Sequence, residues 1–67
     1  PNPFSDRIQV EGLMGDEKFT LLNSLGAVLY EGGNIDQFST TRLTPGIYFL
    51  RIGSGQSVLT QKLIKQN

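Results

Sequence analysis

The fold is decided by the stretch IYFLRI at residues 47–52, which begins with an uninterrupted apolar run of strand length. Side chains of a β-strand point alternately to its two faces, so this stretch is apolar on both faces apart from Arg51. A strand with two apolar faces is typical of the middle of a sheet. The stretch therefore predicts a central β-strand.

The residues just before this stretch, LTPG at 43–46, predict the turn that starts the strand. Pro45 presets φ for the second position of a type II turn, and Gly46 accepts the positive φ of the third position. We therefore expect Gly46 to be a turn residue.

Further strands are predicted where apolar and polar residues alternate with a period of two. Clear alternation occurs at residues 7–11, 17–21 and 27–31, and a longer final strand is predicted at 57–65. Residues 35–43 alternate irregularly, which favours a short or bulged edge strand. No ten-residue window keeps a helical period without a glycine. Six or seven short strands separated by turns predict an all-β fold, a small antiparallel β-sandwich.

Two turns and one irregularity are expected along these strands. Asn23 opens a tight loop in which Gly26 takes a positive φ, so the flanking strands form a hairpin. Residues 53–56 turn the chain into the final strand. The alternation slips at Leu63 and Ile64, which predicts a bulge or a covered edge there.

The composition argues against catalysis. Lys plus Arg is 6 and Asp plus Glu is 6, so a net charge of zero gives no electrostatic reason to bind nucleic acid or an anionic membrane. The chain has no Cys and no His, which excludes disulfides, thiol nucleophiles, thiolate metal sites and the usual proton shuttle at neutral pH. No apolar stretch approaches the roughly 20 residues that span a bilayer. We expect no catalytic residue, no metal site and no cofactor.

Short motifs that could carry chemistry are better explained as turns. Residues 53–55, GSG, lack the further glycines, the lysine and the following helix of a phosphate loop. Asp16 and Glu17 are adjacent carboxylates, but they match neither the spacing of a calcium loop nor a glycosidase pair. We therefore interpret residues 53–55 as a hairpin turn, and Asp16 and Glu17 as part of a solvent-exposed turn.

Four pieces of sequence, taken in order, resemble a known family. They are PNPF at 1–4 before an alternating strand, LNSLGAVLYE at 22–31, LTPGIYFLRI at 43–52 and KLIKQ at 62–66. Their order and spacing resemble the C-terminal sorting domain of cargo of the type IX secretion system, also called the Por secretion system, type A. The resemblance covers essentially the whole chain.

This resemblance implies an immunoglobulin-like β-sandwich that acts as a secretion signal. In that family, a leader takes the cargo to the periplasm, and the folded C-terminal domain is recognised by the outer-membrane translocon and its shuttle proteins. A sortase then commonly removes the domain, and the cargo is attached to the cell surface or secreted. We therefore expect residues 1–67 to be one sorting domain covalently linked to N-terminal cargo, because the chain also lacks an initiator Met.

Seven residues are candidates for recognition by the translocon. Pro1, Asn2 and Pro3 hold the entry chain extended or are recognised directly by the translocon. Gly46 is expected first as a turn residue, and Tyr48 as a half-buried ring with its hydroxyl at the surface. Lys62 and Lys65 either contact the secretion machinery or protect a sheet edge. We expect the translocon to recognise the last strand, at 57–65, for example by adding a strand of its own beside it. The candidates are Pro1, Asn2, Pro3, Gly46, Tyr48, Lys62 and Lys65.

The rival function is a small β-sandwich module that binds carbohydrate or spaces an adhesin. Sugar-binding faces usually offer exposed aromatic rings, but this chain has no Trp and only 2 Tyr. The sequence leaves open the identity of the cargo, the site of sortase cleavage, and whether the isolated domain pairs weakly with a second copy through an edge strand.

Overall fold

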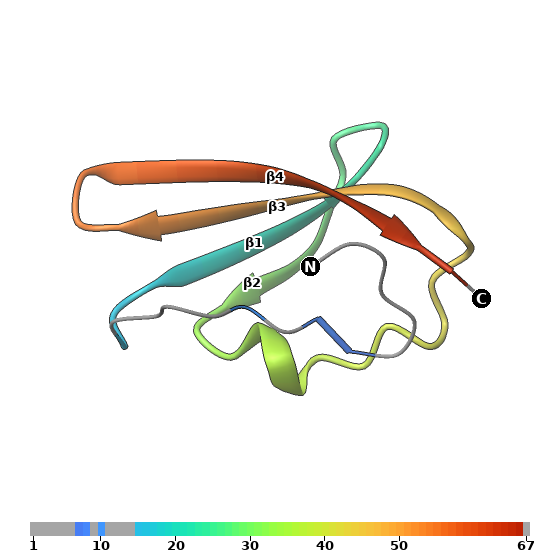
Figure 1. The fold of residues 1–67 in the computed structure, drawn as a ribbon, viewed down its shortest axis with the longest axis horizontal. Coiled ribbons are helices and arrows are strands. Elements are labelled where there is room, and N and C mark those ends of the chain that lie inside the picture. Colours follow the sequence, from blue (N-terminus) through green and yellow to red (C-terminus); the bar gives the residue numbers. More distant parts are fainter. Residues whose placement is uncertain (1–6, 9, 11–14, 67) are drawn as a thin grey trace.

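The computed structural model describes residues 7, 8, 10 and 15–66. The described chain forms a single antiparallel sheet with the strand order β2-β1-β3-β4, and no α-helix occurs in this part (Figure 1). The segment between β2 and β3 and the described N-terminal residues lie across one face of this sheet (Figure 1). The elements are β1 (Lys18–Asn23), β2 (Val28–Gly32), the 3-10 helix η1 (Ile35–Gln37), β3 (Gly46–Ser54) and β4 (Ser57–Lys65).

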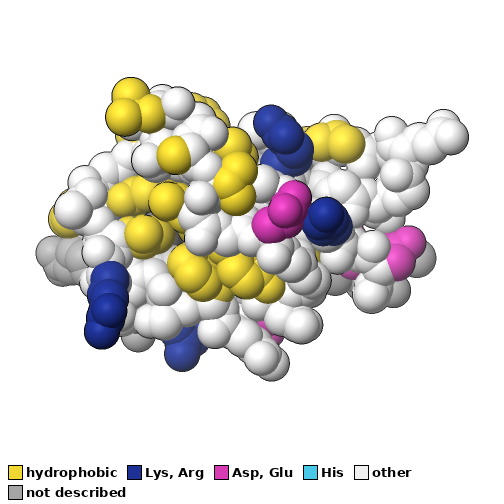
Figure 2. Space-filling view, turned by 180° about the vertical axis from the view of Figure 1, so that it is seen from behind, with side chains coloured by type: hydrophobic (Ala, Val, Ile, Leu, Met, Phe, Trp, Pro, Cys, Tyr) yellow, Lys and Arg dark blue, Asp and Glu magenta, His cyan; other side chains and the backbone are white. Residues whose placement is uncertain are grey.

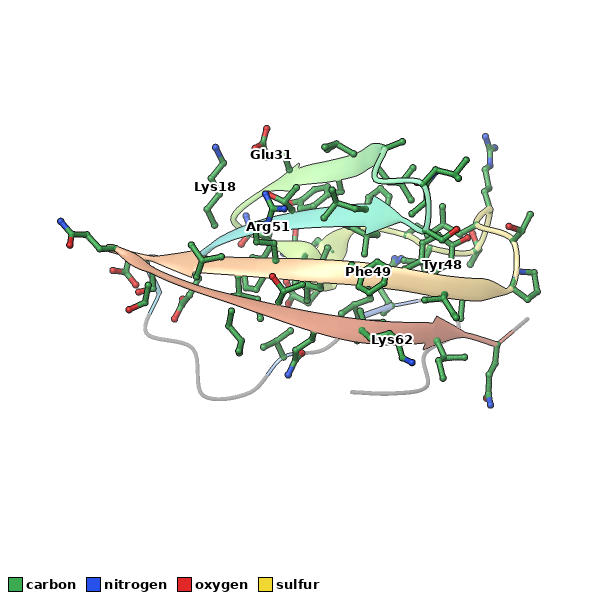
Figure 3. All side chains as sticks on the ribbon, turned by 90° about the horizontal axis from the view of Figure 1, so that it is seen from above. Lys18, Glu31, Tyr48, Phe49, Arg51 and Lys62 are labelled. Carbon is green, nitrogen blue, oxygen red and sulfur yellow. The ribbon has the colours of Figure 1, made fainter. Side chains whose placement is uncertain are left out.

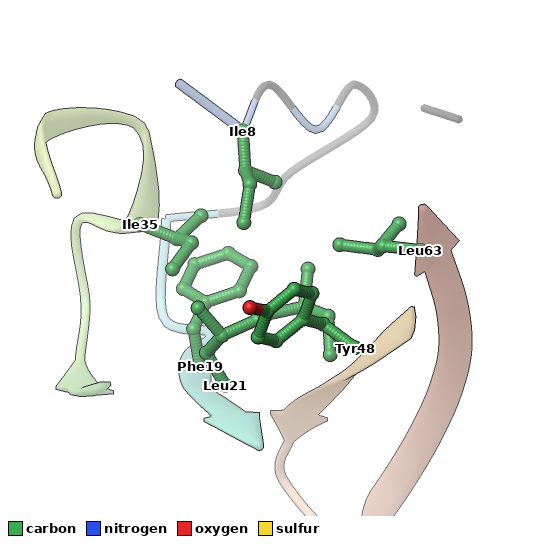
Figure 4. Close-up of a cluster of buried hydrophobic side chains, with 7 residues drawn as sticks. Ile8, Phe19, Leu21, Ile35, Tyr48 and Leu63 are labelled. Atoms are coloured by element: carbon green, nitrogen blue, oxygen red, sulfur yellow. The ribbon is translucent and has the colours of Figure 1, made fainter. Parts of the chain in front are cut away.

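The core lies between this face, which we call the inner face, and the segments that cover it. Alternate residues of three strands point inward, because side chains of a strand change face at each residue. Ile8 and Ile35 pack on them from the covering segments (Figure 4). Burying these apolar side chains provides the main drive for folding. The core residues are Ile8, Phe19, Leu21, Ile35, Tyr48, Leu50 and Leu63.

The prediction of a central strand is confirmed. β3 pairs with β1 along six residues and with β4 along its whole length. The strands predicted at 17–21, 27–31 and 57–65 are present as β1, β2 and β4. The described part is therefore all-β, with four strands in place of the six or seven expected for the whole chain.

The strand predicted at residues 35–43 is wrong. Ile35 begins η1, and the chain then makes a turn in which the backbone N–H of Leu43 donates to the carbonyl of Thr40 at 3.0 Å. A 3-10 turn places residues three apart on the same side, so Ile35 and Phe38 can both face inward. Ile35 is buried, and the ring of Phe38 lies 4.9 Å from that of Tyr30. The apolar spacing of this segment is that of a helical turn.

The strand predicted at residues 7–11 is not formed by its described members. Arg7, Ile8 and Val10 lie outside the sheet, while Gln9 and Glu11 fall outside the described residues. The predicted alternation still holds, because Ile8 is buried and Val10 packs against the core. The described residues of this segment therefore belong to the covering layer.

The turn predicted at 43–46 also differs from the structure. Gly46 has a φ of +154°, which is far from the value near +80° at the third position of a type II turn. It is the first residue of β3, and the hydrogen-bonded turn lies earlier, between Thr40 and Leu43. A positive φ at Gly46 is nevertheless present, as expected.

The irregularity predicted in the last strand occurs elsewhere. Leu63 and Ile64 pair in regular register with Tyr48 and Ile47, so β4 has no bulge. Ile64 points to the exposed outer face, which explains the break in apolar alternation. The register shift lies between β1 and β2, where Leu29 has no partner in the register and packs against the core.

The β1–β2 turn forms as predicted. The side-chain Oδ1 of Asn23 accepts hydrogen bonds from the backbone N–H groups of Leu25 and Ala27, each at 2.9 Å. The backbone of Asn23 accepts from Gly26 and donates to Ala27, each at 3.0 Å. Gly26 has a φ of +87°, a conformation that glycine adopts without strain.

Replacing Asn23 by Ala should lower the free energy of unfolding by about 1 kcal/mol. The substitution removes one acceptor for two backbone N–H groups, and water replaces it only in part because the turn loses its local restraint. Urea denaturation followed by circular dichroism measures the change. Ser24→Ala, in the same turn, is the control and should have a smaller effect. Equal midpoints for the two variants would contradict this account.

Candidate recognition surface

The structure brings three of the seven candidate residues together at the C-terminal end of β4. Gly46 is opposite Lys65 in the β3–β4 register, and Tyr48 is opposite Leu63. Lys62 lies nearby, opposite Phe49, but alternation places it on the other face of the sheet. The remaining candidates, Pro1, Asn2 and Pro3, lie outside the described residues.

Tyr48 is a core residue. Its side chain is 6% exposed, and its hydroxyl donates a hydrogen bond of 2.6 Å to the backbone carbonyl of Thr44. The expectation of a half-buried ring with a surface hydroxyl is therefore wrong. Tyr48 occupies an inner-face position of β3 beside Leu50, and a buried phenol requires a hydrogen-bond partner. The backbone carbonyl of Thr44, four residues earlier in the chain, is that partner.

Lys65 is buried as well. Its inner-face position follows from that of Leu63 two residues earlier, and only 2% of it is exposed. Within the described part of the chain, its Nζ atom has no hydrogen-bond partner. An ammonium removed from water without a partner is destabilising, so Lys65 weakens the end of β4. In this folded state its ammonium is also withheld from any partner protein.

Lys62 and Arg51 are exposed on the outer face of the sheet, and Phe49 is partly exposed there (Figure 3). On the same face, Lys18 and Glu31 form an ion pair with an N–O distance of 3.5 Å. Sequence reasoning marked Arg51 as the polar exception of its stretch, but it missed Phe49 as a surface feature. The signal was present, since residues of β3 must alternate between the core and the opposite face.

Two of the hollows at the described surface lie beside the β1–β2 turn. One, of about 310 Å³, lies between the β1–β2 turn and residues 42–46, and its lining includes Gly46 and Tyr48. The other, of about 230 Å³, lies on the outer face, and its lining includes Leu22 and Phe49. Figure 2 shows that hydrophobic side chains also gather on the back of the molecule, beside basic and acidic ones.

The described residues contain no group of three or more His, Cys, Asp or Glu that could hold a metal ion. In the same part of the chain, no helix is long and apolar enough to cross a membrane.

The family model described as the secretion system C-terminal sorting domain matches residues 1–66. The chain belongs to the secretion system C-terminal sorting domain family. The match confirms the resemblance to type IX sorting domains that the sequence pieces indicated. No curated protein and no solved structure matches the chain. This family is a family of sorting signals and not one of enzymes, and a type IX signal implies export to the outer membrane, the cell surface or the medium.

Replacing Lys65 by Met should raise the free energy of unfolding of the sorting domain by about 1–3 kcal/mol, because the unpartnered buried ammonium is removed and a side chain of similar length remains. Thermal or urea unfolding measures the change. Lys62→Met, at an exposed position of the same strand, is the matched control and should not raise the free energy of unfolding, because no buried ammonium is removed. A lower stability for Lys65→Met would show that the ammonium is satisfied in solution.

Proposed function

We propose that this sorting domain is the C-terminal segment of a larger cargo protein and that the type IX translocon of the outer membrane recognises it in its folded form. The observation that carries the proposal is the family match over residues 1–66, which leaves almost no part of the chain for another function. A leader takes the cargo to the periplasm, shuttle proteins and the translocon then receive it, and a sortase removes the domain before surface attachment or release.

Two observations support an immunoglobulin-like sandwich as the fold of the whole domain. A hairpin, a long connection and a second hairpin give the order β2-β1-β3-β4, which fits the larger sheet of such a sandwich. The hydroxyl of Tyr48, near the start of β3, bonds to the backbone of Thr44 four residues upstream, as in the tyrosine corner of these folds. Ile8, Val10 and Ile35 then belong to a reduced second layer.

Recognition involves the end of β4. In the described part of the chain, β4 is the outermost strand of the sheet, so its outward-pointing side chains are within reach of the translocon. Lys62 offers an exposed charge there. Lys65 destabilises the same end of β4. Separating this end from the sheet therefore costs less free energy than separating the rest of the strand. Gly46, opposite Lys65, and the entry residues Pro1, Asn2 and Pro3 complete the proposed recognition set.

The carbohydrate-binding or adhesin-spacer alternative gains no support from the described surface. The large hydrophobic side chains exposed there are all aliphatic, whereas sugar-binding faces stack sugars on aromatic rings. They are Leu25, Val28, Ile47, Val58, Leu59 and Ile64.

The function is tested by fusing the 67-residue chain behind a leader and a reporter in a bacterium that has the type IX machinery. We expect the reporter to reach the outer surface or the medium, and to remain in the periplasm of a strain that lacks the translocon. Reporter retained in the periplasm of both strains would contradict the proposed function.

The role of the β4 end is tested by deleting residues 62–67 from the same fusion. The deletion removes Leu63 from the core, so Lys62→Glu is tested beside it as a variant that leaves the core intact. We expect both changes to reduce export, and Arg42→Glu, an exposed charge reversal away from β4, to preserve it. Normal export of the deletion and of Lys62→Glu would show that the translocon reads another part of the domain.

A further inference from the structure

The outer face of the sheet is uncovered in the described structure. The segment between β2 and β3 and the described N-terminal residues pack on the inner face, and no described element packs on the other (Figure 1). Apolar side chains nevertheless point outward from the strands. Those exposed or partly exposed on this face are Leu22, Val28, Ile47, Phe49, Val58 and Ile64. An apolar sheet face of this kind is typical of a surface that another protein covers.

The face is hollowed at one place. Leu22 and Phe49 are direct neighbours in the β1–β3 register, and they line the depression of about 230 Å³ together with Arg51. The β1–β2 turn forms its rim through Ser24 and Gly26. Pockets for small-molecule ligands usually measure roughly 300–1,000 Å³, so this depression suits a single inserted side chain better.

The charges of the face are strongly unequal. Among the described residues, Lys18, Arg51 and Lys62 point outward beside the carboxylate of Glu31, so this part of the face carries more basic than acidic groups although the chain is neutral. Glu31 is paired with Lys18, and Arg51 has no ion pair among the described residues. Arg51 also stands at the wall of the depression. An inserted side chain would therefore meet a guanidinium that can bind a carboxylate.

We propose that the outer face docks the sorting domain on a folded receptor protein of the secretion machinery, and that this receptor offers an apolar side chain beside a carboxylate. The apolar side chain enters the depression over Leu22 and Phe49, and the carboxylate binds Arg51. A second copy of the domain is disfavoured as the occupant because it would bring two positive faces together. The proposal rests on the proposed function, since it describes how the same signal is bound.

The test uses the reporter fusion described above with two outer-face variants, Arg51→Glu and Phe49→Thr. We expect each to lower the rate of export about tenfold or more, as for an anchor at the centre of an interface. The matched controls are Arg42→Glu, an exposed arginine elsewhere, and Leu59→Thr, an exposed apolar residue that alternation places on the inner side of β4. Both should export at nearly the normal rate.

Melting temperatures of the isolated variants show whether a loss of export reflects unfolding. Arg51→Gln, which keeps an exposed polar side chain, is included because it should lower export while the fold persists. Normal export of Arg51→Glu and Phe49→Thr, while the unmodified fusion is exported, would overturn the docking proposal and leave the function intact. If the unmodified fusion is not exported, both the docking proposal and the proposed function are contradicted.

Sedimentation velocity tests whether the outer face binds a second copy of the domain instead of a receptor protein. We expect the isolated domain to be monomeric over a wide concentration range, with Phe49→Thr sedimenting like the unmodified domain. A dimer that Phe49→Thr dissociates would assign the face to a second copy and contradict the proposal.

Discussion

The structure depends on covering one face of a single sheet. Phe19, Leu21, Leu50 and Leu63 cannot bury themselves within a single layer, so the fold requires a second layer that packs across them. Ile8 and the η1 segment meet this requirement. The sheet then has two different faces, and everything that the domain presents to a partner follows from which residues point away from the covering layer.

The strands of this sheet could be predicted from the sequence because each has a local signal. Alternation predicted β1, β2 and β4, and a run apolar on both faces predicted that β3 is central. The turn chemistry of Asn23 and Gly26 was equally local.

The covering segments were harder to predict because tertiary packing decides their conformation. Ile35 and Phe38 can face the core from a strand with a bulge or from a 3-10 turn, and only contact with Tyr30 distinguishes the two. The alternation of residues 7–11 correctly predicted that Ile8 is inside, but it could not show that Arg7, Ile8 and Val10 lie outside the strands of the sheet.

The recognition residues show the same division between local and tertiary signals. The sequence pieces sufficed for the family, which the match over residues 1–66 confirms. Burial of individual side chains was less predictable, since Lys65 is carried inward by the register of its strand although lysine itself prefers water. Phe49 was missed for the opposite reason, because the apolar residues of its stretch were assigned to a strand covered on both faces.

The uneven charge of the described outer face has a consequence for how the domain approaches a partner. Among the described residues, this face carries Lys18, Arg51 and Lys62 beside Glu31, so its local field differs from that expected of a neutral chain. Near an anionic target a domain with such a face rotates before it touches, and it arrives already oriented. Because this torque acts over distances comparable to the Debye length, dissolved ions set how early the rotation begins.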